Sequence, residues 1–88
     1  MEKSFQFDHY QITVQWEGGF LVQICDLETK EVWESEPHLS ATEAVNQADR
    51  VLLWYFEAFD SRNCEERQTF REQISHLAEQ MRYLNGER

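Results

Sequence analysis

Apolar residues occupy every second position in two stretches near the beginning of the chain, on either side of the short segment 17–19. Alternation with a period of two is typical of a β-strand that buries one face and exposes the other. The two glycines of the intervening segment favour a tight turn. The pattern therefore predicts an antiparallel hairpin with strands at about 9–17 and 20–26. Its apolar residues are Tyr10, Ile12, Val14, Trp16, Phe20, Val22 and Ile24.

The length of the turn sets the register of this hairpin. A three-residue loop places Trp16 opposite Phe20 and keeps these seven residues on one face. A two-residue loop would place Val14 opposite Gln23 and mix the two faces. We favour the three-residue loop, with Gly19 supplying the positive φ of a bulged turn.

A third strand is predicted at about 31–36, after a short polar turn. The sequence allows two registers, with either Val32 or Trp33 opposite Ile24 of the second strand. We favour Trp33, because this register buries the larger ring. Pro37 ends the strand, since proline has no N–H for a strand ladder.

A first helix is predicted over about 41–60. Ser40 and Glu43 have the spacing of a capping box, in which the serine hydroxyl accepts a backbone N–H and the glutamate reaches back to the N–H of the cap. Apolar residues follow at helical spacing, as expected for a helix that buries one side. They are Ala44, Ala48, Val51, Leu52, Tyr55 and Phe59.

A second helix is predicted over about 64–85, closed by Gly86. Its apolar residues are spaced four, three, four and three positions apart, which is the spacing of alternating heptad positions. They are Phe70, Ile74, Leu77, Met81 and Leu84.

The order of these elements predicts an α+β fold: a three-stranded antiparallel β-meander followed by two α-helices, with the first helix packed on the sheet. Phe5 and Phe7 are compatible with a small additional edge strand. The chain has 88 residues and no repeat or linker-like segment, so residues 1–88 are predicted to form one domain.

The chain is strongly acidic, with 17 Asp and Glu against 8 Lys and Arg and a formal net charge of −9. Such a charge repels phosphate backbones, so direct nucleic-acid binding is not expected. No apolar run reaches the roughly 20 residues that span a bilayer, and no signal-type segment precedes the hairpin. Two cysteines make no disulfide framework, and a cytoplasmic location is therefore predicted.

The side chains that usually carry chemistry are scattered along the sequence. His9, His38 and His76 lie on three different predicted elements, and neither Cys25 nor Cys64 belongs to a Cys-x-x-Cys pair. No metal site and no cofactor are therefore expected. Cys64 begins the second helix, whose N-terminus can lower a thiol pKa, but an idle or packed first-turn cysteine is the simpler interpretation. We predict a protein that is not an enzyme.

Five acidic residues fall within eleven positions of the second turn and third strand, offset only by Lys30. They are Asp26, Glu28, Glu31, Glu34 and Glu36. Their local negative field suits a docking patch for a basic protein partner, because complementary charge speeds association. The same charges on an edge strand also prevent pairing between sheet edges. Both roles stay open, and a small regulatory or interaction domain that binds a basic protein is the function we predict.

The alternative function is a structural homo-oligomer. The apolar seam of the second helix covers only about two heptads, which is short for a coiled coil. Folding back onto the first helix explains the same residues and is favoured, but a homodimer through the remaining apolar surface stays open. The residues predicted for that interface are Trp54, Phe56, Phe70, Ile74, Leu77, Met81 and Leu84.

Four short motifs resemble a known family. They are Tyr10-Gln-Ile-Thr-Val14, Gly18-Gly19-Phe20, Asp26-Leu27 and Ser40-Ala-Thr-Glu43-Ala44. Their order, followed by an amphipathic helix, resembles the HicB-like antitoxin domain over residues 10–59. The motifs are generic to a unit of three strands and a helix. The resemblance implies an acidic domain that blocks a basic, RNA-cleaving toxin.

Overall fold

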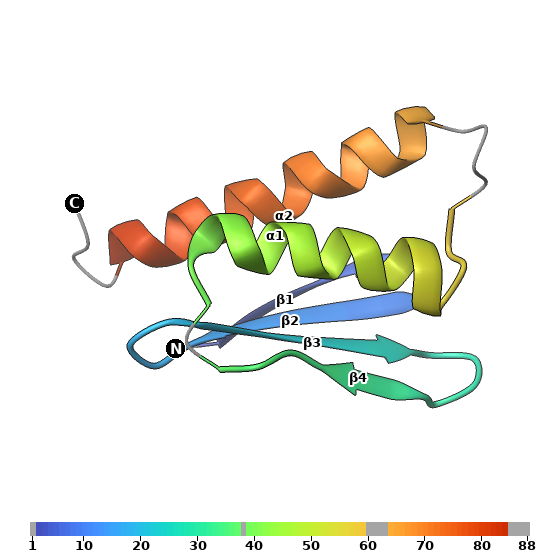
Figure 1. Cartoon of the computed structure of the whole chain (residues 1–88), viewed down its shortest axis with the longest axis horizontal. Helices are drawn as coiled ribbons and strands as arrows, with labels where there is room; N and C mark the ends of the chain where they lie inside the picture. Colours follow the sequence, from blue (N-terminus) through green and yellow to red (C-terminus); the bar gives the residue numbers. More distant parts are fainter. Residues whose placement is uncertain (1, 38, 60–63, 85–88) are drawn as a thin grey trace.

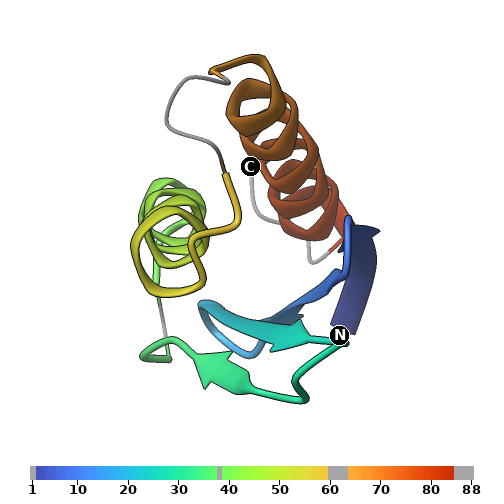
Figure 2. The same cartoon turned by 90° about the vertical axis from the view of Figure 1, so that its right-hand side faces the viewer.

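The computed structural model describes residues 2–37, 39–59 and 64–84, with Cys64 and residues 82–84 as backbone only (Figure 1). Its elements are β1 (Glu2–Phe7), β2 (Tyr10–Trp16), β3 (Phe20–Asp26), β4 (Val32–Glu34), α1 (Ala41–Arg50), the π-helix η1 (Val51–Tyr55) and α2 (Cys64–Leu84). The strands form one antiparallel sheet in the order β1-β2-β3-β4. Both helices lie on the same face of this sheet, so the structure has two layers (Figure 2).

The fold is α+β with an antiparallel sheet, as predicted, but the sheet has four strands where three were predicted. The additional strand, β1, pairs with β2 over all six of its residues. Phe5 and Phe7 are partly buried against the core. In the sequence these two aromatic residues stand among polar ones, which made the pattern too short to predict more than a small edge strand.

The β2–β3 register is the predicted one, with Trp16 opposite Phe20. The prediction of a positive φ at Gly19 is wrong, since Gly18 takes that conformation with a φ of 77°. Phe20 already pairs with Trp16 on one side and exchanges two backbone hydrogen bonds with Leu39 on the other. The loop therefore has the three predicted residues, and its positive φ falls at the middle one.

β4 has three residues rather than the six predicted at 31–36. Its register has Trp33 opposite Ile24, which confirms the favoured alternative. Ser35 ends the strand, because its hydroxyl oxygen accepts the N–H of Val22 at 2.8 Å. The side chain thus takes the place of the carbonyl that a regular ladder would use.

α1 begins at the predicted capping box. The Glu43 N–H donates to the Ser40 hydroxyl oxygen at 3.2 Å. The return contact differs from the prediction, since the Ser40 hydroxyl itself donates to the Glu43 carboxylate at 3.0 Å. The Ser40 hydroxyl therefore makes both hydrogen bonds of the capping box, one as acceptor and one as donor.

The first helix does not continue to residue 60 as an α-helix, which corrects the prediction. It passes after Arg50 into η1, where the Phe56 N–H donates to the Val51 carbonyl at 3.0 Å. Glu57 then takes a positive φ of 52°, which ends the helix. This reversal brings Phe59 back to the core, where it is 7% exposed.

α2 buries its apolar seam inside the chain. Phe70, Ile74 and Met81 are fully buried. The ring of Phe70 lies 6.1 Å from that of Phe5 and 5.3 Å from that of Phe7. α2 therefore covers the β1–β2 half of the sheet, while α1 contacts β3 (Figure 2).

The two helices are joined by a buried ionic contact around Asp49 of α1, which is only 2% exposed. Its carboxylate accepts two hydrogen bonds from Arg67, at 2.8 and 2.7 Å, and a third from Arg71 at 2.8 Å. Arg71 also donates to Asn46 at 2.9 Å. We call these four residues the Asp49 clamp. Burial acts to raise the pKa of Asp49, but the hydrogen bonds and charges of both arginines outweigh it and hold the pKa below its ordinary value.

Asp49→Ala is expected to lower the free energy of unfolding by roughly 3 kcal/mol, the low end for breaking a buried ion pair. We expect the low end of that range because both arginines are partly exposed, so that water can hydrate their guanidinium groups once the carboxylate is removed. Urea unfolding followed by circular dichroism measures the change. As a control, Glu72→Ala removes an exposed acid of α2 and should change the free energy by less than about 0.5 kcal/mol. Equal effects of the two variants would contradict the clamp.

The lowered pKa of Asp49 also predicts how stability depends on pH. Because the folded-state pKa lies below the unfolded-state value of about 3.9, the ionised carboxylate stabilises the fold above that value. The stabilisation is lost as the pH falls through the folded-state pKa. The difference in unfolding free energy between the wild type and Asp49→Asn should therefore stay constant between about pH 7 and 5 and shrink below about pH 4. Urea unfolding at several pH values measures this difference, and a constant difference down to acid pH would contradict the assignment.

Candidate functional site

Four of the five acids predicted as a docking patch are exposed along the β4 edge of the sheet. Glu28 lies in the β3–β4 turn, Glu31 directly before β4, Glu34 at its last position and Glu36 beyond it. This turn lies at the same end of the molecule as the end of η1 (Figure 1). Lys30 is the one basic residue between positions 26 and 36, so the hairpin presents a negative surface.

The fifth acid, Asp26, lies in a different environment, because it is 7% exposed and shapes the turn. Its Oδ1 accepts the N–H of Glu28 at 2.9 Å and that of Thr29 at 3.2 Å. Burial acts to raise the pKa of Asp26, but the N–H groups of Thr29 and Glu28, with a smaller effect of His9, hold it below its ordinary value. Asp26 therefore positions the turn that carries the exposed acids.

Tyr55 of η1 connects the helical layer to this acidic hairpin, because its phenol donates a hydrogen bond to Glu31. That hydrogen bond and the charge of Glu31 raise the pKa of Tyr55. Tyr55 is 56% exposed and its neighbour Trp54 is 74% exposed. Aromatic and acidic side chains therefore share one end of the molecule. We call Glu28, Glu31, Glu34, Trp54 and Tyr55 the acidic-aromatic surface.

The residues predicted for an oligomer interface fall into two groups. The fully buried ones are Phe70, Ile74 and Met81. The ones that keep some exposure are Trp54, Phe56 and Leu77. The side chain of Leu84 lies outside the described residues. In this conformation only the second group faces the surface.

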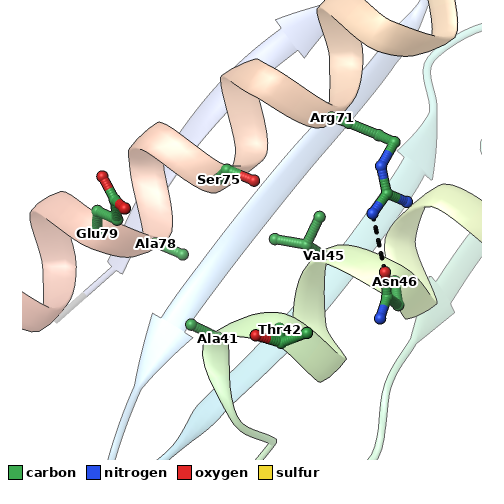
Figure 3. A pocket seen from close by; sticks show the side chains of 8 residues that line it. All are labelled: Ala41, Thr42, Val45, Asn46, Arg71, Ser75, Ala78 and Glu79. Atoms are coloured by element: carbon green, nitrogen blue, oxygen red, sulfur yellow. Dashed lines mark hydrogen bonds between the residues drawn. The ribbon is translucent and has the colours of Figure 1, made fainter.

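A groove of about 210 Å³ runs between α1 and α2 (Figure 3). Within it, Arg71 reaches across from α2 to hydrogen-bond Asn46 of α1. The guanidinium of Arg71 is already held by Asp49 as well. Neither a histidine nor a cysteine lines this groove, so it contains neither an imidazole base nor a thiol nucleophile.

His9, in the β1–β2 turn, lies near three carboxylates. Its ring nitrogens are 3.1 Å from Asp8, 3.8 Å from Asp26 and 3.7 Å from Glu28. Even so, no group of three or more His, Cys, Asp or Glu within the described residues could hold a metal ion. Of the thiols, Cys25 is partly buried, while the side chain of Cys64 lies outside the described residues.

Comparison with known proteins assigns no family to the chain: no family model, no curated protein and no solved structure matches it. Within residues 2–37, 39–59 and 64–84, no helix has both the length and the apolar character needed to cross a bilayer.

The two environments of the acidic residues predict different effects on stability. Asp26→Ala should lower the free energy of unfolding by about 1–2 kcal/mol, because two backbone N–H groups of the turn lose their acceptor. Asp26→Asn keeps an acceptor oxygen and should lose less. Glu28→Lys, in the same turn but exposed, should change it by less than about 0.5 kcal/mol. Urea unfolding of the three variants makes the comparison, and a Glu28→Lys effect as large as that of Asp26→Ala would refute the assigned roles.

Proposed function

We propose that this chain is a non-catalytic interaction domain that binds a basic protein partner through the acidic-aromatic surface. The proposal keeps Glu28, Glu31 and Glu34 of the predicted patch, leaves out Glu36, which lies beyond β4, and adds Trp54 and Tyr55. It assigns Asp26 to the turn and not to the partner. In this proposal the protein acts in the cytoplasm and needs neither a metal ion nor a cofactor.

The hydrogen bond between Tyr55 and Glu31 carries the proposal, because it joins side chains that attract a cation in two ways. Carboxylates form charge-assisted hydrogen bonds with Arg and Lys. The faces of Tyr and Trp rings attract the same groups through cation–π contacts, best of all with Arg. A surface that is already held together also loses little conformational freedom when a partner binds.

Protection of the sheet edge accounts for only part of this surface. Acidic residues beside an edge strand do discourage pairing with another strand. That role gives no reason for a tryptophan to remain 74% exposed next to Tyr55 on η1, in the other layer. Binding a basic partner gives a role to both the acids and the rings.

The resemblance to HicB-like antitoxin domains extends this proposal to a particular partner class. Under that extension the partner is a small basic toxin that cleaves RNA, and the acidic-aromatic surface meets the protein rather than its RNA substrate. A basic partner of any other class would leave the first proposal in place and remove the extension.

Capture of partners from a native lysate, with identification by mass spectrometry, tests the surface. Basic proteins should be bound at low salt and released at high salt, because exposed charges are screened beyond about 10 Å at 0.1 M ionic strength. The double variant Glu31→Lys/Glu34→Lys should reduce capture by at least about tenfold, since attraction becomes repulsion at two positions. Trp54→Ala should weaken capture without changing its salt dependence.

A matched control separates the surface from the net charge. Glu17 lies in the β2–β3 turn at the opposite end of the sheet, and Glu72 is exposed on α2. The variant Glu17→Lys/Glu72→Lys changes the net charge by the same amount and should retain capture. Capture that survives Glu31→Lys/Glu34→Lys, or that is lost equally in the control, would contradict the proposed site.

A further inference from the structure

The outer edge of β1 carries backbone groups that no described strand uses. β1 is the terminal strand of the sheet order, and its hairpin with β2 places Phe7 opposite Tyr10 across a two-residue loop. In such a hairpin the flanking pair and every second pair beyond it exchange the ladder hydrogen bonds. The N–H and C=O groups of Glu2, Ser4 and Gln6 therefore point away from β2, and all three residues are exposed.

A groove of about 240 Å³ lies beside this edge, between β1 and α2. Its apolar side chains are Phe5 and Leu77, and its polar ones are Gln6, Gln73, His76 and Gln80. Not one of these side chains is a carboxylate. In a chain with a net charge of −9, an identical chain meets little repulsion at this side, because the groove adds no acid and β1 carries one acid, Glu2, beside one base, Lys3.

We propose that two copies of this chain associate through their β1 strands, which pair antiparallel about a two-fold axis and join the two sheets into one. A two-fold axis makes the contact self-complementary, because each strand offers the other the groups that it needs. With Phe5 on the axis, Ser4 of each copy lies opposite Gln6 of the other. The two pairs then exchange four backbone hydrogen bonds.

The same register places apolar groups together on the helix-facing side. Phe5 meets its counterpart in a pair that is not hydrogen-bonded, where opposing side chains are closest. Leu77 of α2 shares the groove with Phe5, so it lies near its own counterpart across the axis. Among the residues predicted for an oligomer interface, this arrangement uses Leu77 and leaves the buried seam of α2 intact.

This inference does not rest on the proposed function. β1 and β4 are opposite edges of the sheet, so pairing at β1 leaves both acidic-aromatic surfaces free at the outer edges of the dimer. Failure of one proposal therefore does not decide the other.

Sedimentation equilibrium over a range of protein concentrations tests the proposal. The informative variant is Ser4→Pro, because the Ser4 N–H points away from β2 and its loss leaves the β1–β2 ladder intact. The dissociation constant of the dimer should rise roughly thirty-fold, since two of the four hydrogen bonds are lost. Ser4→Ala keeps the N–H and should dimerise like the wild type.

Amide hydrogen exchange of the wild type gives a second measurement that depends on no variant. Exchange at Ser4 and Gln6 should slow as the protein concentration rises, while exchange at Phe5 and Phe7 should be slow at every concentration. A strict monomer at about 1 mM protein would overturn the proposal. So would a dimer that Leu77→Asp dissociates but that Ser4→Pro leaves unchanged, because its contact would then lie between helices and not between strands.

Discussion

The buried carboxylate of Asp49 constrains the position of every element above the sheet. A charge that is 2% exposed is tolerated only when its partners are in place. Those partners, Arg67 and Arg71, lie one turn apart on α2, so the contact fixes how far α2 is displaced along α1. Because both arginines reach toward α1, the contact also fixes the rotation of α2 about its axis, which leaves Phe70 facing Phe5 and Phe7.

The position of α1 also affects the candidate site, because η1, which carries Tyr55, begins two residues after Asp49. Leu52 is fully buried, and its carbonyl accepts the Ala58 N–H at 2.7 Å as the helix closes. Leu52 is held in the core, and the π-helix has a wider turn than an α-helix. The residues after Leu52 therefore point in other directions than they would in a continuing α-helix. Tyr55 thereby leaves the apolar stripe and meets Glu31 on the surface.

The sequence predicted best those features whose causes are local. Apolar residues at every second position and a three-residue turn were enough for the β2–β3 register, and the larger ring of Trp33 decided the register of β4. β1 was underestimated because much of its stability comes from α2, whose Phe70 packs on Phe5 and Phe7. A partner more than sixty residues away leaves no mark on the local pattern.

The Asp49 clamp was missed, although the sequence carries a signal for it. Asp49 lies four residues after Val45 and three before Leu52, which places a charge on the apolar side of a helix. Arg67 and Arg71 have the spacing that puts two cations on one face of the second helix. A charge at a buried position and a matching pair elsewhere together indicate an internal ion pair. Neither feature indicates it alone.

The two edges of the sheet differ in a way that limits how copies of the chain can assemble. β4 has three residues, carries acids on both sides and is interrupted at Ser35, whose hydroxyl replaces a ladder carbonyl. Such an edge resists pairing with another strand. β1 has six residues and lies beside a groove without carboxylates. In the proposed dimer both β1 edges are used and only β4 edges remain, so the joined sheet cannot add further copies. The contact therefore closes at two chains instead of growing into a fibre.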